Sequence, residues 1–277
     1  MTKQKKILLN MWLSFFTLIM IYPLLWMFFA SFKSNQEIFS SASLLPKSFS
    51  LDAFITGWSS VGRITYTHFF INTFKIVVPS VIFTVVSSVL VAYGFARFDF
   101  PFKKQIFGIM LATLMLPHTV IMIPRYMMFR NLGWLDTYLP FYVPAMLATY
   151  PFFTFMLVQF FRNIPKELDE AAKIDGCSSF KTLVLVLLPT LKPAIFSVAI
   201  FQFVWMWSDF LNPLLYLSSV KNYPISLALR MSLDAAASVE WSPIMAISTV
   251  SVIPPMLLFF FAQKYFVEGI SNSGLKG

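Results

Sequence analysis

Few side chains in this sequence of 277 residues have the types and spacing that catalysis or metal binding needs. The two histidines, His68 and His118, are far apart, and the one cysteine, Cys177, excludes an intramolecular disulfide or a Cys-rich metal site. No pair of acids or Ser–His arrangement supports an integral membrane enzyme. The phosphate-binding pattern G-x-x-x-x-G-K-[ST] is also absent. The sequence therefore predicts no catalytic residue, no metal site and no cofactor bound by this chain.

The scarce charged residues gather instead in the segment 162–192, which predicts two short helices joined by a turn. Asn163 is a suitable N-cap for the first helix, and Pro165 suits its first turn. Asp169 precedes Lys173 by one helical turn, in the favourable acid-first order. Gly176 ends this helix, because the position needs a positive φ. A second helix is expected over 178–188, stopped by a proline.

Two adjacent alanines, Ala171 and Ala172, are expected to lie exposed on the first of these helices. Small side chains there let another backbone or side chain approach closely, which suits a helix that seats in a groove on a partner protein. A surface helical hairpin with no partner explains the composition equally well.

The spacing within this segment resembles a known family signature. Glu170-Ala171-Ala172, then Gly176, then Val186 and Leu188-Pro189 resemble the EAA signature of ABC-importer permeases, in which Ile is usual at the position of Val186. Further stretches resemble the binding-protein-dependent permease domain, namely Asn72-Thr73 and Ala92–Arg97. A narrower group is the smaller permease subunit of carbohydrate importers, of the maltose and multiple-sugar type. The stretches that resemble it are Gln263–Gly269, Gly274–Gly277 and Trp207–Phe210 with Pro213-Leu214.

This resemblance implies a function and a set of partners. The helix around Glu170–Gly176 would be the coupling helix, seated in an ABC ATPase dimer that holds ATP and Mg. A second, homologous permease would complete the pore as a heterodimer, and an extracytoplasmic sugar-binding protein would deliver a carbohydrate, most simply an oligosaccharide. The tail Ser271–Gly277 would reach toward the ATPase. The implied ATPase-coupling residues are Glu170, Ala171, Ala172, Asp175, Gly176, Val186, Leu188 and Pro189.

One further group of residues could contact a sugar. Asp209 is the one acid inside a predicted span, and a charge at the bilayer centre costs at least about 2.5–3.5 kcal/mol. It is either a cavity or gate residue that bonds sugar hydroxyls, or an acid near the outer headgroups or bonded to the partner subunit. Trp205, Trp207 and Tyr216 could stack on sugar rings, but aromatic residues also form belts at membrane interfaces.

Composition indicates which elements must position these residues. The chain is 58% hydrophobic and 12% charged, against about 25% charged in soluble domains, which excludes a soluble or disordered protein. Apolar runs long enough to cross a bilayer predict an all-α fold of six spans. The expected spans are Ile7–Ala30, 71–95, 105–124, 139–161, 193–217 and 242–262.

Most of the 21 Lys and Arg residues fall in the segments expected on the same side of the membrane as the N-terminus, which predicts that both termini are cytoplasmic. The net charge of +9 comes without a basic-aromatic motif for nucleic acid, so the expected surroundings are the lipid of a bacterial cytoplasmic membrane. With the resemblance, the chain divides into a first span and external loop (1–70), a permease core of type I ABC-importer fold (71–262) and a cytoplasmic tail (263–277).

Two alternatives remain open on the sequence. An ABC permease for glycerol phosphate, a polyamine or an amino acid would share the same signature, since only the C-terminal ending favours sugar. A stand-alone secondary transporter would need ion-coupling residues within the membrane, for which Asp209 is the single candidate.

Overall fold

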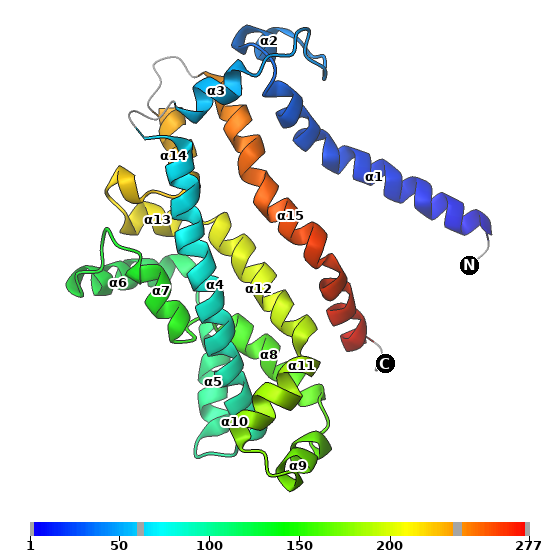
Figure 1. Cartoon of the computed structure of the whole chain (residues 1–277), viewed down its shortest axis with the longest axis vertical. Helices are drawn as coiled ribbons and strands as arrows, with labels where there is room; N and C mark the ends of the chain where they lie inside the picture. The colour runs from blue at the N-terminus through cyan, green and yellow to red at the C-terminus, as the bar shows by residue number, and fades with distance from the viewer. Residues whose placement is uncertain (1–2, 60–63, 235–239, 275–277) are drawn as a thin grey trace. The chain divides into compact units, whose positions relative to one another are not determined.

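The computed structural model describes residues 3–59, 64–234 and 240–274, and it is built from α-helices (Figure 1). Contacts divide the chain into two compact units. The first unit contains Met1–Phe70 and Ile225–Pro254, and the second contains Ile71–Pro224 and Pro255–Gly277. The long helices α4 (Tyr66–Arg97) and α15 (Trp241–Gly274) each begin in the first unit and continue into the second.

The first unit fixes the polar stretch that follows the first span. It contains α1 (Lys3–Ala30), α2 (Asn35–Ser40), α3 (Asp52–Trp58) and α14 (Ile225–Asp234). The Asn35 side chain accepts a hydrogen bond from the backbone N–H of Trp241 at 2.9 Å, and Ser242 donates to the carbonyl of Lys33 at 2.7 Å. The start of α15 is thereby joined to the turn after α1.

The second unit contains both regions that the sequence singled out. Its helices after α4 are α5 (Lys103–Thr113), α6 (His118–Asn131), α7 (Leu139–Met146), α8 (Pro151–Asn163), α9 (Glu167–Ile174), α10 (Ser179–Lys181), η1 (Thr182–Leu187), α11 (Leu188–Thr190), α12 (Lys192–Trp207), α13 (Leu211–Tyr216) and η2 (Val220–Asn222). A core of buried residues joins the end of α4 to α8, η1 and α12 and includes Phe161, Leu183 and Leu187.

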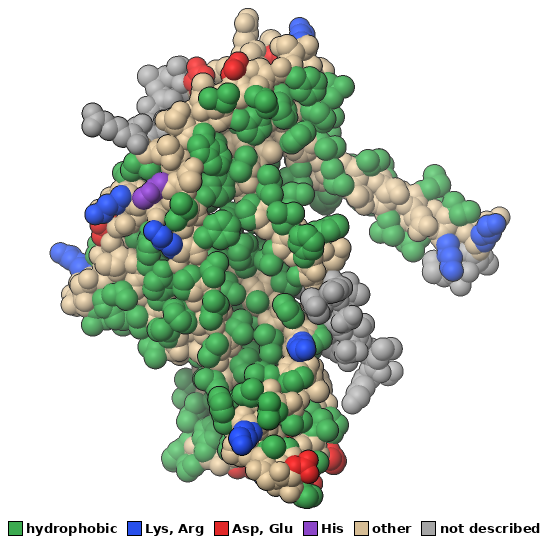
Figure 2. Space-filling model, viewed as in Figure 1, with side chains coloured by type: hydrophobic (Ala, Val, Ile, Leu, Met, Phe, Trp, Pro, Cys, Tyr) green, Lys and Arg blue, Asp and Glu red, His purple; other side chains and the backbone are tan. Residues whose placement is uncertain are grey.

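Four helical segments in the described chain are long and apolar enough to cross a membrane, namely Lys3–Ala30, Tyr66–Arg97, Leu139–Asn163 and Trp241–Gln263. Two bent helix pairs raise the number to six if each pair is one span. Large hydrophobic side chains are exposed along these helices, and Figure 2 shows them over much of the visible surface. Lipid is the solvent that suits such a surface.

The third expected span, 105–124, is wrong as a single straight helix. α5 and α6 meet at a bend of 102°, and α6 continues to Asn131, within the stretch expected to be an external loop. Pro117 occupies the N-cap of α6 with an extended ψ of 133°. A proline lacks the N–H that a continuous helix needs and disfavours helical geometry in the residue before it, so the chain turns here.

The fifth expected span, 193–217, is also interrupted. α12 ends at Trp207 and α13 begins at Leu211, so Asp209 lies between two helices instead of inside one. In one continuous helix the ring of Pro213 would clash with the carbonyl of residue 209, which explains the break. In the described part of the expected loop 218–241 the chain forms the helices η2 and α14.

The expected tail 263–277 is helical as far as Gly274, because α15 continues beyond the apolar run that ends at residue 262. The part of the predicted ATPase-directed tail at 275–277 lies outside the described residues.

A half-buried acid, Asp136, ties the segment after α6 to the segment after α13. Asp136, at a φ of 56°, accepts hydrogen bonds from the backbone N–H groups of Ser218 and Ser219 and from the side chain of Asn222. Burial by itself raises the pKa of Asp136, but these bonds and that from the Ser219 hydroxyl outweigh it and lower the pKa to about 2.

Candidate functional site

The 162–192 loop begins differently from the expectation, because Asn163 is not the N-cap of α9. Asn163 is the last residue of α8, and Lys166 occupies the N-cap position of α9. Pro165 forces the residue before it out of the helical region, and Ile164 accordingly is extended, with φ −81° and ψ 126°. The proline therefore ends one helix here, and the next helix starts after it.

The predicted role of Gly176 at the end of α9 is confirmed. Its φ is 78°, and its N–H donates to the carbonyl of Lys173 at 3.0 Å. The N–H of Cys177 donates to the carbonyl of Ala172 at 2.9 Å. These two bonds form a Schellman motif, which closes the last turn and requires a left-handed residue. Glycine adopts that conformation without strain.

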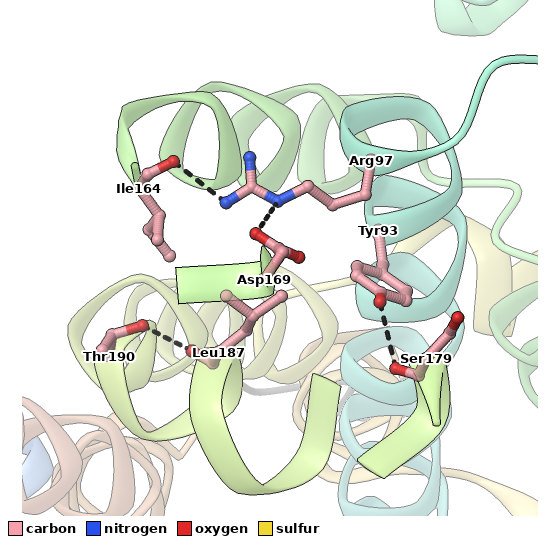
Figure 3. Close-up of polar contacts among 7 residues, drawn as sticks. All are labelled: Tyr93, Arg97, Ile164, Asp169, Ser179, Leu187 and Thr190. Atoms are coloured by element: carbon pink, nitrogen blue, oxygen red, sulfur yellow. Dashed lines mark hydrogen bonds and ion pairs between the residues drawn. The ribbon is translucent and has the colours of Figure 1, made fainter. Parts of the chain in front are cut away.

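An ion pair fixes the inner side of α9 to the end of α4 (Figure 3). The Nε of Arg97 lies 3.0 Å from Oδ2 of Asp169, and the two side chains are only 7% and 15% exposed. The same guanidinium donates through Nη2 to the carbonyl of Ile164 at 2.9 Å. Nearby, the Tyr93 hydroxyl donates to the carbonyl of Ser179 at 3.0 Å. One arginine thus holds both ends of the short connection between α8 and α9.

This ion pair replaces the predicted one. Asp169 was expected to support Lys173 within α9, but its carboxylate is turned inward to Arg97. The predicted pair of exposed alanines is half wrong for a related reason. Ala171 is exposed, but Ala172 is buried on the side where α9 packs against η1. Glu170, Asp175 and Gly176 are exposed with Ala171.

The second half of the loop is a continuous helical run, and Pro189 does not stop it. α10, η1 and α11 follow one another from Ser179 to Thr190, and the bend of 80° to α12 comes after that. η1 is a π-helix in which the N–H of Leu188 bonds the carbonyl of Leu183. Because a proline ring clashes with the carbonyl four residues earlier in an α-helix, the wider turn before Pro189 accommodates the ring.

The remaining signature residues lie in η1 and α11, the second half of the loop. Val186 is half-buried in η1, while Leu188 is half-buried against the hydrophobic core that includes Leu187. Pro189 itself is exposed.

Several hydrophobic side chains of the loop are exposed, and the sequence reasoning missed the two most exposed ones. Ile174 is 88% exposed at the last position of α9, and Phe180 is 66% exposed in α10. α9 also carries three acids in its first turn, Glu167, Asp169 and Glu170, so Ile174 shares its helix with charged side chains. Exposed apolar residues with a charged surround are typical of protein contact surfaces. The signal in the sequence was Ile174 itself, an apolar residue directly before the helix-ending Asp-Gly.

Two of the three predicted cavity residues come together. Trp205 and Asp209 line a cavity of about 580 Å³ beside α6, α7 and α13. Asp209 accepts hydrogen bonds from the backbone N–H and the side-chain amide of Asn212, at 3.2 and 2.7 Å. Trp207 is not among the cavity residues: it is buried against Phe74.

Comparison with known proteins identifies the family. The model of the binding-protein-dependent transport system inner membrane component matches residues 84–272, more than half of the chain. The chain belongs to this family. It is therefore a multi-pass membrane permease, and its membership argues against the stand-alone secondary transporter.

Relatives of this permease align with nearly its whole length. It is 30% identical to the arabinooligosaccharides transport system permease protein AraQ of Halalkalibacterium halodurans, over 98% of this chain and 96% of that one. It is 32% identical to the sn-glycerol-3-phosphate transport system permease protein UgpE of Agrobacterium fabrum, over 91% of each chain.

A solved structure has the same fold. One chain of a bacterial ABC transporter involved in the import of the acidic polysaccharide alginate superposes with a TM-score of 0.83 at 20% identity, and the match covers 96% of this permease and 99% of that chain. The predicted all-α permease fold is confirmed.

Proposed function

We propose that this permease forms one half of the translocation pathway of an ATP-driven carbohydrate importer, and that the 162–192 loop is where the ATPase docks. The observation that carries the proposal is the two-sided construction of α9. Its inner side is held by the Arg97–Asp169 ion pair and the buried Ala172, and its outer side presents Glu170 and Ile174. A short, fixed helix with an exposed apolar residue suits insertion into a groove of another protein.

The same contacts supply a path for force. When the ATPase subunits close on ATP, they would displace α9, and the Arg97 side chain would carry that displacement to α4. α9 also packs against η1, which continues through α11 to α12. α12 ends beside the cavity that contains Trp205 and Asp209. Motion at the loop would thus reach the cavity through η1, α11 and α12, because closely packed elements move together.

The partners follow from this role. A second, homologous permease would complete the pore, and an ATPase dimer would hold ATP and Mg. A binding protein would deliver the solute from outside, as the family description supports. The loop and both termini would face the cytoplasm, in agreement with the excess of Lys and Arg on that side.

The substrate class has one rival. The match to an arabinooligosaccharide permease over almost the whole chain supports a carbohydrate, and the C-terminal resemblance points the same way. A phosphorylated polyol is the second candidate, because the glycerol 3-phosphate permease UgpE is related at a similar identity.

A purification and an uptake assay test the proposal. The permease is isolated in mild detergent, and we expect a second permease and an ATPase to accompany it. The complex is then reconstituted with its binding protein and assayed with maltose, arabinotriose, diacetylchitobiose and glycerol 3-phosphate. ATP-dependent uptake of a sugar supports the proposal. A lone oligomer with ATP-independent uptake contradicts it, and uptake of glycerol 3-phosphate alone selects the rival substrate.

A further inference from the structure

The cavity beside Asp209 contains polar groups that the fold leaves without partners. Within the described part of the chain, the side-chain nitrogen Nε2 of Gln202 and the side-chain oxygen Oδ1 of Asn212 are buried and accept or donate no hydrogen bond. Both residues line the cavity, and Gln202 is only 1% exposed. Buried polar groups in folded proteins are nearly always bonded, so open polar groups that line one cavity point to a polar ligand that bonds them there.

The chemistry of Asp209 determines which end of the Asn212 amide is open. A carboxylate can only accept hydrogen bonds, so the NH₂ group of Asn212 must face it. Accordingly, Nδ2 of Asn212 lies 2.7 Å from Oδ2 of Asp209. The carbonyl oxygen of Asn212 is therefore the end left available. The side-chain nitrogen Nε2 of Gln202 has no hydrogen-bond partner among the described residues, so its NH₂ group is the open end of this amide. The cavity thus offers an open acceptor at Asn212 and an open donor at Gln202.

These groups match the chemistry of a sugar. A hydroxyl both donates and accepts, so it can bond the Asn212 oxygen and the Gln202 nitrogen. The ring of Trp205, which is partly exposed and lines the same cavity, offers a flat face for a sugar ring. Arg125 and Asp209 both line the cavity, and their formal charges cancel, which favours an uncharged ligand. The volume of about 580 Å³ lies within the range of small-molecule sites, about 300–1,000 Å³.

We propose that this subunit itself contacts an uncharged, polyhydroxylated ligand in this cavity, through Gln202, Asn212 and Trp205. Asp209 is a positioning residue, which orients the Asn212 amide and does not itself bond the ligand. This inference rests on the proposed function and adds to it the residues and the neutrality of the ligand. Of the roles that the sequence left open for Asp209, it replaces a direct bond to sugar hydroxyls by an indirect one through Asn212.

The test uses the complete complex in proteoliposomes, with the ATPase and the binding protein, and the same four solutes. The measured quantity is solute moved per ATP hydrolysed. Gln202→Met removes the open donor and keeps the length of the side chain, and Asn212→Ala removes the open acceptor. Ser197→Ala is the matched control, because this buried hydroxyl lies on the same helix, bonds the Pro193 carbonyl and does not line the cavity.

We expect Gln202→Met and Asn212→Ala each to lower sugar moved per ATP by about three- to tenfold, the effect of one lost hydrogen bond. Ser197→Ala is expected to match the wild type. If both cavity variants also match it, the inference is wrong although the proposed function stands. Uptake of glycerol 3-phosphate alone contradicts the neutral ligand, and a wild type that moves none of the four solutes contradicts the proposed function and this inference together. Should Gln202→Met fail to assemble, Asn212→Ala decides.

A double-mutant comparison tests the role of Asp209. If Asp209 acts through Asn212, then Asp209→Asn combined with Asn212→Ala will lower sugar moved per ATP no further than Asn212→Ala alone. A purely structural role predicts additive losses that are the same for every sugar. Additive losses, or an Asp209→Asn variant with wild-type ratios for every sugar, would contradict the positioning role.

Discussion

The 162–192 loop and the Asp209 cavity both concentrate polar side chains in a chain that is 58% hydrophobic, but they leave different groups open. In the loop, the charged group of Asp169 is turned inward and paired with Arg97, and an apolar side chain, Ile174, is left exposed. In the cavity, polar atoms of Gln202 and Asn212 are left open, although they are buried.

This difference matches two kinds of partner. A protein that must receive force needs a stiff contact, and internal pairing of the polar groups supplies stiffness while apolar groups supply contact area. A small solute that must leave again is better served by a few open hydrogen-bonding groups in a preformed cavity. Changes in the loop should therefore affect every solute alike, and changes in the cavity should depend on the solute.

The largest effect is expected for Arg97→Met, which would leave the Asp169 carboxylate nearly buried without its partner. Breaking such a pair by removing one charge costs on the order of 3–5 kcal/mol. We expect α9 to detach from α4, the 162–192 loop to become sensitive to proteases, and uptake per ATP to fall equally for all sugars. Arg97→Lys keeps the charge but cannot contact both Asp169 and the Ile164 carbonyl, so its uptake per ATP should lie between that of the wild type and that of Arg97→Met. If uptake per ATP fell by different factors for different sugars, the loop would affect solute selection, and the proposed difference between the loop and the cavity would be wrong.

The second effect concerns the end of α9. Gly176→Val puts a β-branched residue at a φ of 78°, which costs about 1–3 kcal/mol in backbone strain. Among the described residues no other group lies within 4 Å of a new Cβ at this position, so the strain comes from the backbone. We expect ATP hydrolysis to continue while uptake is lost. Gly176→Asn is the control, because asparagine tolerates this conformation, and uptake should largely persist. Equal uptake in the two variants would show that the geometry of this turn is not needed.

A smaller effect is expected for Ile174→Ser, which removes the exposed apolar group without disturbing a buried contact. The affinity of the isolated permease pair for the ATPase should fall by about 1–2 kcal/mol, as for a moderate contact residue in an interface. Binding can be measured with both partners in detergent. Leu185→Ser, also exposed but in η1, is the comparison. An affinity loss only in Leu185→Ser would move the docking surface away from α9.

The smallest effect is expected outside both regions, at Asp136. Its pKa is about 2, below the ordinary value of 3.8, so its bonds stabilise the folded chain fully above about pH 4, and this stabilisation is lost as the pH falls toward 2. Asp136→Asn should lower the free energy of unfolding by about 1 kcal/mol at neutral pH. It should also reduce the fall in that free energy between pH 4 and pH 2. An unchanged pH dependence would show that these bonds are not formed in the membrane.

The sequence predicted the helical membrane fold and the position of the loop, because apolar runs and the Glu170–Pro189 spacing are local signals. It did not predict the breaks beside Pro117 and Pro213, since a proline within an apolar run can equally be tolerated in a straight span. The breaks are consequential, because the second one carries Asp209 out of the helix and into contact with Asn212.

The partner of Asp169 could not be predicted either. Lys173 is four residues away in the same helix, whereas Arg97 is distant in the sequence and is brought near only by packing of α4 and α8 in a shared core. The same limit applies to Gln202, which reads as one polar residue in an apolar helix until the cavity beside it is known.

The central claim is that α9 is the contact between this permease and its ATPase, and a cross-link tests it most directly. The native Cys177 is first replaced by serine, and a cysteine is introduced by Ile174→Cys. A second variant carries Phe102→Cys at a position that is also exposed but directly precedes α5. In the assembled complex we expect a short thiol-reactive cross-linker to join position 174 to the ATPase, and position 102 to give no such product. An ATPase adduct formed from position 102 but not from position 174 would contradict the account.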